Sequence, residues 1–355
     1  MRNKFQITGP ILIAERCESP QSMAMRQEKK LTPGSRYARP VRESIASFRL
    51  RRQSRRVKNT LLYWLMRAGL FAAERLPIHG FLRLLGRIAP FIFRREAQRA
   101  QTHLRAALPD LDAPKIMRRM FAHFAESLWE LSRLRRFVPQ LDFEAKQVLD
   151  AALAEGKGAI LISGHVGNWE LLGQTIAAAG YPISTVATPL YDPRVTKWLH
   201  RWRTRHGLKI HWRDKNNGKT ILRVLRRNQL MGFLIDQDIK TAGDYVPFFG
   251  RPAFTPTTPA ALALRTGAPL LFCWHHRRGK RHQITIERVC FERSGADAAV
   301  VLSLTALLTA RLEDVIRAVP EQWVWMHRRW RTVRRDSDSD TSDFPQPDSR
   351  ESQSL

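Results

Sequence analysis

A histidine and a glutamate stand five residues apart in the segment SGHVGNWELLG, where an apolar run leads into an amphipathic one. Five residues turn an α-helix by about 140°, so His165 and Glu170 can meet only if the histidine precedes the helix. Asn168 is a favourable N-cap residue, which places His165 in a glycine-containing loop and Glu170 in the first helical turn. From that turn the carboxylate is expected to reach back to an imidazole nitrogen.

Such a pair suits general base catalysis. A carboxylate on one imidazole nitrogen fixes the tautomer and raises the basicity of the other, which then takes a proton from a hydroxyl. A structural loop histidine with a hydrogen-bonded partner is the alternative interpretation. Zinc proteases need two histidines at i and i+4, and a serine hydrolase needs GxSxG; this chain has neither pattern at the motif. We therefore expect an acid–base enzyme that needs no metal and no cofactor.

Strands and helices alternate around the motif. Apolar runs predict strands at 158–163, 183–188, 208–212, 229–235, 268–275 and 283–289. Helical periodicity predicts helices at 113–137, 168–180, 194–206, 220–227 and 300–319. This order predicts an α/β fold with a central, mostly parallel sheet flanked by helices.

The two ends of the chain differ from its middle. Residues 1–58 hold 15 basic and 4 acidic residues with little apolar periodicity, which predicts a disordered basic arm. Met23 and Met25 are alternative start positions within it. Residues 336–355 hold six acidic residues against one arginine and predict a disordered acidic tail. The catalytic domain is expected to span residues 59–335.

Residues 59–95 predict two helices that lie in a membrane interface. The stretch from Thr60 to Leu76 is apolar around most of its circumference, with Arg67, Glu74 and Arg75 on one side. A second stretch mixes Leu, Ile and Phe with four arginines in the same way. Ordinary amphipathic helices packed on the domain are the alternative. Because Arg67 interrupts the longest apolar run, we expect no transmembrane span, although attachment by one spanning helix stays open.

The charge of the chain favours an anionic partner. The 60 Lys and Arg exceed the 32 Asp and Glu, giving a net charge of +28, which suits nucleic acid, anionic lipid or an acidic protein. No nucleic-acid-binding motif is present, so no nucleic acid is expected. Cys17, Cys273 and Cys290 show neither a CxxC pair nor zinc spacing and are expected to be free thiols.

Four blocks in the chain resemble one family, in the family's order. They are SGHVGNWE, the RTRHG that begins at Arg203, the segment from Asp236 to Leu271 that begins DQD, and PEQWVWMHRRW from Pro320 to Trp330. Together they resemble the lipid A late acyltransferases with an HxxxxE signature, the lauroyl and myristoyl transferases of Gram-negative inner membranes. The resemblance covers residues 59–335 and implies a fold like that of the glycerol-3-phosphate acyltransferases.

The resemblance implies roles for four residues. His165 corresponds to the family's catalytic base and Glu170 to its orienting acid. Arg203 corresponds to an arginine near the reaction centre that binds phosphate or a developing oxyanion, although arginines flank it two residues away on either side. Asp236 is expected to position Arg203 or the substrate headgroup, with a turn-forming aspartate as the alternative. The PEQWVWMHRRW block is expected to be structural and to close the domain.

The implied reaction is acyl transfer from a thioester, carried by acyl carrier protein or coenzyme A, to a hydroxyl of a lipid A precursor. It is expected at the cytoplasmic face of the bacterial inner membrane, where an anionic surface and the acidic carrier suit the positive charge. No covalent acyl-enzyme is expected. The alternatives are another acceptor, such as a lysophospholipid, an amino-acid lipid or a phosphatidylinositol mannoside, and a basic nucleic-acid-binding protein.

Overall fold

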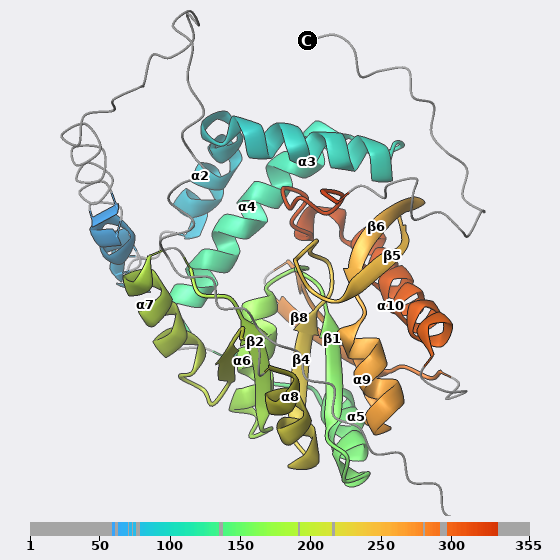
Figure 1. The fold of residues 1–355 in the computed structure, drawn as a ribbon. Helices are drawn as coiled ribbons and strands as arrows, with labels where there is room; N and C mark the ends of the chain where they lie inside the picture. The colour runs from blue at the N-terminus through green and yellow to red at the C-terminus, as the bar shows by residue number, and fades with distance from the viewer. Residues whose placement is uncertain are drawn as a thin grey trace, which may run out of the picture. The chain divides into compact units, whose positions relative to one another are not determined.

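The computed structural model describes residues 59–332, apart from several short gaps (Figure 1). The gaps are 61–62, 70, 73, 76–78, 135–137, 191, 215–216, 280 and 292–296. The arm predicted at 1–58 and the tail predicted at 336–355 lie outside the described residues, as does Cys17. Of the two described cysteines, Cys273 is a buried free thiol and Cys290 is an exposed one.

A six-stranded sheet in the order β3-β2-β4-β1-β7-β8 forms the centre of the domain. Its strands are β1 (Ala159–Ser163), β2 (Ile183–Ala187), β3 (Lys209–Trp212), β4 (Leu230–Leu234), β7 (Leu270–Arg278) and β8 (Arg281–Arg288). β1 pairs in parallel with β4 and β7, and β8 is antiparallel to β7. Every residue of β1 is buried, as expected for a parallel strand covered on both faces. The predicted α/β class and mostly parallel sheet are confirmed.

Helices cover both faces of this sheet (Figure 1). They are α2 (His79–Ile92), α3 (Arg94–Ala107), α4 (Ala113–Ser132), α5 (Phe143–Ala154), α6 (Trp169–Ala178), α7 (Pro193–Arg203), α8 (Asn217–Arg226), α9 (Thr258–Thr266) and α10 (Ala298–Ala318). Ile160 and Ile162 of β1 join a core cluster that includes residues of α8, α9 and α10. Ala159 and Leu161 join a second cluster with residues of α5 and α6. The period-2 alternation of the strand thus separates two cores.

The sequence prediction did not include one hairpin, formed by β5 (Gly243–Phe248) and β6 (Arg251–Pro256). Three prolines lie in these strands, and proline weakens a strand prediction because it cannot donate a ladder hydrogen bond. The turn residues Phe249 and Gly250 both have positive φ, 52° and 68°, as a tight hairpin turn with a right-handed strand twist requires. This pairing brings the hairpin beside α10.

The N-terminal segment is helical where it is described, at residues 59–60, 63–69, 71–72 and 74–75 and throughout α2. α2 packs on α4 at Gly86, where an added Cβ would lie 2.7 Å from the Ala122 Cα, so only glycine permits this approach. Its other side exposes large apolar residues, including Phe81, Phe91 and Ile92. Among the described helices, none combines the length and the apolar content that crossing a bilayer requires.

Candidate active site

His165 lies in the loop between β1 and α6, and Asp236 follows β4 by two residues. β1 and β4 are parallel neighbours, so the residues after their carboxyl ends meet at one edge of the sheet. There the His165 Nδ1 lies 2.7 Å from Asp236 Oδ1, and the backbone N–H of His165 donates to Asp236 Oδ2 at 2.7 Å. The aspartate therefore orients both the ring and the backbone of this histidine.

Asp236 is fully buried, and the Trp323 indole N–H also donates to its Oδ2 at 2.8 Å. Burial alone would raise the pKa of Asp236, but the adjacent His165 ring and its hydrogen bonds hold that pKa well below the usual range. The ionised carboxylate accepts a hydrogen bond, which places the His165 proton on Nδ1. Nε2 is left as the basic nitrogen, on a side chain that is 12% exposed.

The predicted contact between His165 and Glu170 is wrong. Asn168 caps α6, as predicted, with its Oδ1 accepting from the Leu171 N–H at 3.2 Å. Glu170 then follows in the first turn, where its carboxylate accepts from Arg203 Nε, 2.8 Å from Oε2, and also from Arg203 Nη2. The expected contact of Asp236 with Arg203 is likewise replaced by its contacts with His165. The two predicted partners are thus exchanged: Asp236 contacts His165, and Glu170 contacts Arg203.

Arg203 ends α7, and its side chain is 20% exposed while it holds Glu170. The carbonyl of Arg203 accepts a hydrogen bond from the Gln174 amide on α6, which ties the two helices together. The flanking residues Arg201 and Arg205 are exposed. Of the three arginines, Arg203 is therefore the one whose side chain turns toward the motif, where it contacts Glu170.

Two of the residues that adjoin the His165 ring carry polar groups and were not assigned to the site by sequence reasoning. The Gln237 amide nitrogen lies 3.3 Å from His165 Nε2 and 3.3 Å from His327 Nε2. The His327 ring stands edge-on to the His165 ring, with their centroids 4.7 Å apart. Burial lowers the pKa of His327 to about 4, so this second ring is neutral near pH 7.

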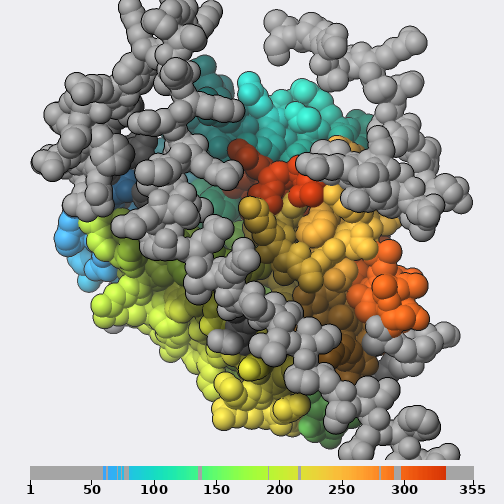
Figure 2. All heavy atoms as spheres, in the orientation of Figure 1, coloured from blue at the N-terminus to red at the C-terminus, as the bar shows by residue number. Residues whose placement is uncertain are grey.

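His327 belongs to the PEQWVWMHRRW block, which the sequence analysis interpreted as structural. In the space-filling view this red segment reaches the surface between the cyan α3 and the yellow β5–β6 hairpin (Figure 2). Arg99 of α3 donates to the Met326 carbonyl at 3.1 Å, and Arg329 donates to the Phe254 carbonyl of β6. The block therefore contributes His327 to the site in addition to closing the domain. In the sequence, a histidine beside several tryptophans was the signal that could have indicated this second role.

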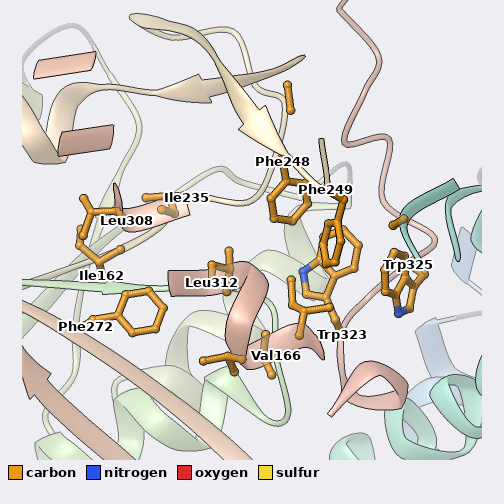
Figure 3. Close-up of a cluster of buried hydrophobic side chains, with 14 of the residues drawn as sticks. Ile162, Val166, Ile235, Phe248, Phe249, Phe272, Leu308, Leu312, Trp323 and Trp325 are labelled. Atoms are coloured by element: carbon orange, nitrogen blue, oxygen red, sulfur yellow. The ribbon is translucent and has the colours of Figure 1, made fainter. Parts of the chain in front are cut away.

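The loop that carries His165 is clamped by the same block. Val166 forms an isolated antiparallel bridge with Trp323, and the Gly167 N–H donates to the Gln322 carbonyl at 2.8 Å. Figure 3 shows Trp323 between Val166 and Phe248, in the cluster of buried apolar side chains next to the site. Gly167 has a φ of +58°, and an added Cβ would lie 2.1 Å from the His275 carbonyl oxygen. The glycine is required by this close packing.

His165, Asp236 and His327 offer ligand atoms that lie within 4.8 Å of one another, a set able to hold a metal ion. Both oxygens of Asp236 already accept hydrogen bonds from protein N–H groups. A carboxylate whose oxygens are occupied in this way orients a base more readily than it ligates a metal. We therefore interpret the three residues as a hydrogen-bonded acid–base group.

The low pKa of His327 predicts that the protein loses stability in mild acid. Below pH 6.5 the unfolded chain protonates this ring, whereas the folded protein does so only near pH 4, so the free energy of unfolding falls as pH decreases through that window. The loss from this residue amounts to up to about 3 kcal/mol. Asp236 has a lowered pKa, so its contribution persists through this window and is lost only in stronger acid. Denaturant unfolding at pH 7, 5.5 and 4.5 measures the slope, and His327→Gln should make it shallower; an unchanged slope would contradict this assignment.

Comparison with known proteins identifies one family whose model matches this chain. Residues 50–332 match the family model described as bacterial lipid A biosynthesis acyltransferase. A phosphatidylinositol mannoside acyltransferase of Mycobacterium tuberculosis is 32% identical over 187 residues, which are 51% of this chain and 57% of that protein. The lipid A biosynthesis palmitoleoyltransferase of Escherichia coli is 26% identical over 296 residues, 76% of this chain and 92% of that protein.

The coverage of these relatives differs. The alignment with the mycobacterial protein spans little more than half the length of that relative. The lipid A biosynthesis lauroyltransferase of Escherichia coli is 25% identical over 292 residues, again 76% of this chain and 92% of that protein. The higher identity is thus to a phosphatidylinositol mannoside acyltransferase, and the longer alignments are to lipid A biosynthesis acyltransferases.

Proposed function

Since the chain belongs to the bacterial lipid A biosynthesis acyltransferase family, we propose that it moves a fatty acyl chain from a thioester to a hydroxyl group of a membrane lipid. The observation that carries this proposal is the 2.7 Å contact between His165 Nδ1 and the buried carboxylate of Asp236. It leaves Nε2 of a partly exposed ring as a base, in the loop that leads into the helical turn where Glu170 holds Arg203. A base and a held cation are groups that acyl transfer to a hydroxyl uses.

In the proposed reaction, His165 Nε2 takes the proton of the acceptor hydroxyl as its oxygen attacks the thioester carbonyl. The tetrahedral intermediate then collapses, the carbon–sulfur bond breaks, and the thiolate takes the proton back from His165. Asp236 stabilises the positive charge that the ring carries between the two steps. The acyl group passes directly to the acceptor, so the proposal includes no covalent acyl-enzyme.

Arg203 is proposed to stabilise negative charge, either on the tetrahedral oxyanion or on a phosphate of the substrate. Glu170 accepts from two nitrogens of its guanidinium and so fixes the plane of the group. Glu170 therefore supports the reaction through Arg203, which differs from the role that the sequence motif suggested. The neutral His327 ring adds no positive charge beside His165, so charge forming on His165 during the reaction meets no repulsion there.

The donor is proposed to be a thioester of acyl carrier protein or of coenzyme A, and the acceptor a hydroxyl of a lipid A precursor at the cytoplasmic face of the bacterial inner membrane. The net charge of +28 favours both an anionic membrane surface and an acidic carrier protein. A phosphatidylinositol mannoside or a related glycolipid is the second candidate acceptor, because a relative of that name is 32% identical. We propose no nucleic-acid partner.

Mass spectrometry of the lipids of a deletion strain tests this function. Lipid A should lose the mass of one acyl chain, and expression of the wild-type protein, but not of His165→Ala, should restore it. If lipid A is unchanged and another glycolipid loses a chain, the acceptor assignment fails while the acyltransferase assignment holds. An unchanged lipid profile would contradict both.

The exposed side of α2 predicts that the protein sediments with membranes. Leu84, Ile88 and Phe91 are 52%, 44% and 69% exposed and recur at helical spacing, so they form one apolar face. High salt alone should release little protein, since burial of apolar groups resists screening. Replacing all three by serine should weaken binding to vesicles that contain anionic lipid by about 10- to 100-fold.

A matched control for this experiment replaces three exposed apolar residues outside α2. Leu111, Phe143 and Leu307 are 41%, 73% and 38% exposed, and their replacement by serine should leave vesicle binding close to that of the wild-type protein. Full recovery of the wild-type protein in the soluble fraction without detergent would show that α2 does not enter the interface.

A further inference from the structure

A buried polar network lies behind the catalytic loop, where β7 and β8 meet α4. Its members are His123, Glu126, Ser127 and Glu130 of α4, His275 and Arg277 of β7, His282 of β8, and Asn168 of the loop. Asn168 is 1% exposed and His275 is fully buried, so these groups depend on one another for hydrogen bonds. The proposed reaction uses none of them directly.

Asn168 is held through both its backbone N–H and its side chain. Its backbone N–H donates to His275 Nδ1 at 2.9 Å, and its side-chain nitrogen donates to Glu130 Oε2 at 2.9 Å. Its side-chain oxygen caps α6. This one residue stands between His165 and Glu170 in the chain, so its position sets the distance and angle between the two halves of the site.

Three hydrogen bonds and one longer contact around Asn168 form a closed ring of contacts that fixes the tautomers of both histidines. Because His275 Nδ1 accepts from a backbone N–H, the proton of this neutral ring is on Nε2. His275 Nε2 then donates to His282 Nδ1 at 2.9 Å, which places the His282 proton on Nε2, 3.6 Å from Glu130 Oε1. Glu130 accepts from Asn168 and completes the ring. Burial lowers the pKa of His275 well below its usual range, so the ring stays uncharged at neutral pH.

Arg277 holds Glu130, one member of this ring of contacts, in place. Its Nε and Nη2 donate to the two oxygens of Glu130, each at 2.8 Å, and its Nη1 lies 3.2 Å from Glu126. The backbone of Arg277 exchanges two hydrogen bonds with the Gln322 side chain, at 2.8 and 2.9 Å. The Gln322 carbonyl in turn accepts from the Gly167 N–H. The network thus holds the loop at two consecutive residues.

We propose that His275 is a positioning residue for acyl transfer, which acts through its Nδ1 on the Asn168 N–H, with Glu130 holding the side chain of Asn168 from the opposite side. The proposal rests on the proposed function, because it states how His165 and Arg203 come to face one substrate. A shift of the loop by a fraction of an ångström changes the alignment of the base with its hydroxyl, and rates are steeply sensitive to such shifts. Neither residue contacts the reacting atoms.

Two amide substitutions separate positioning from simple packing. In His275→Asn the side-chain oxygen stands where Nδ1 stood and still accepts from Asn168, whereas in His275→Gln the amide lies one carbon further out, toward His282. The positioning role predicts that His275→Asn keeps most of the activity and that His275→Gln lowers kcat by about 10- to 100-fold with KM within about twofold. Simple packing predicts the opposite order, because glutamine is closer to histidine in size.

The matched control is His276→Gln, the next residue of β7, whose side chain points to the other face of the sheet. It should keep the kcat of the wild-type protein. Rates are measured on the full chain in detergent as thiol release from lauroyl-coenzyme A with a phosphorylated diglucosamine lipid as acceptor. Should His275→Gln not fold, His275→Leu removes the same acceptor. Equal losses in the Asn and Gln variants, or wild-type kcat in the Gln variant, would overturn the proposal.

A spectroscopic readout keeps this test independent of the reaction. In ¹⁵N-histidine NMR spectra, His275 should show the Nε2–H tautomer from pH 6 to 8. The His165 resonances should shift in His275→Gln and return toward their wild-type positions in His275→Asn. If the wild-type protein transfers no acyl chain to this acceptor while these shifts occur, the proposed substrate fails and the positioning role stands. Unchanged His165 resonances in the Gln variant would overturn the positioning role.

Discussion

Replacing His165 by alanine is expected to lower the rate of acyl transfer by about two to four orders of magnitude, the range that a general base contributes. Asp236→Asn keeps the shape of the side chain but removes the charge that holds the proton on Nδ1, so it should approach the same loss. The double variant should be scarcely slower than His165→Ala, since an orienting acid has no function once the base is gone.

This coupling is measured with a double-mutant cycle on variants that circular dichroism shows to be folded. His206→Ala is a suitable control for loss of a histidine, because that ring bonds to the Leu134 carbonyl outside the site. It should keep the rate within about a factor of three. Losses from His165 and Asp236 that multiply would mean that the two residues act separately. Near wild-type activity in His165→Ala would mean that the base lies elsewhere.

The second large effect is expected at Arg203. Arg203→Ala should lower kcat by about 10²- to 10³-fold, the usual cost of losing one group that stabilises an oxyanion. Arg203→Lys keeps the charge but loses the two-nitrogen contact with Glu170, so an intermediate loss is expected. Arg201→Ala and Arg205→Ala change exposed arginines on either side and should stay within about a factor of two.

Variants of Glu170 distinguish the pairing that the sequence suggested from the pairing in the structure. The HxxxxE spacing suggested that Glu170 orients His165, in which case Glu170→Ala would be non-additive with His165→Ala. The structure instead joins Glu170 to Arg203, so Glu170→Ala should be non-additive with Arg203→Ala and should multiply with His165→Ala. Coupling of Glu170 to His165 alone, in the rate of transfer, would contradict the observed pairing.

Local pattern determined much of this protein from its sequence. The burial of β1, the Asn168 cap and the helical turn that holds Glu170 follow from residue types within about ten positions, and all are present in the structure. So is the parallel sheet, because alternating strands and helices leave few other topologies. His165 belongs in a loop for the same local reason.

The pairing of charges was decided by tertiary structure. Asp236 is 71 residues from His165 and Arg203 is 33 from Glu170, so neither contact leaves a mark in local spacing. Strand order determines which acid contacts His165. Because β4 lies beside β1, Asp236 contacts Nδ1 of His165. Arg203 lies at the end of α7 and contacts Glu170 in the first turn of α6. His327 and the ring through Asn168 and His275 arise in the same way. Periodicity along one segment predicts which face is buried; only the packed sheet determines which distant side chain lies opposite.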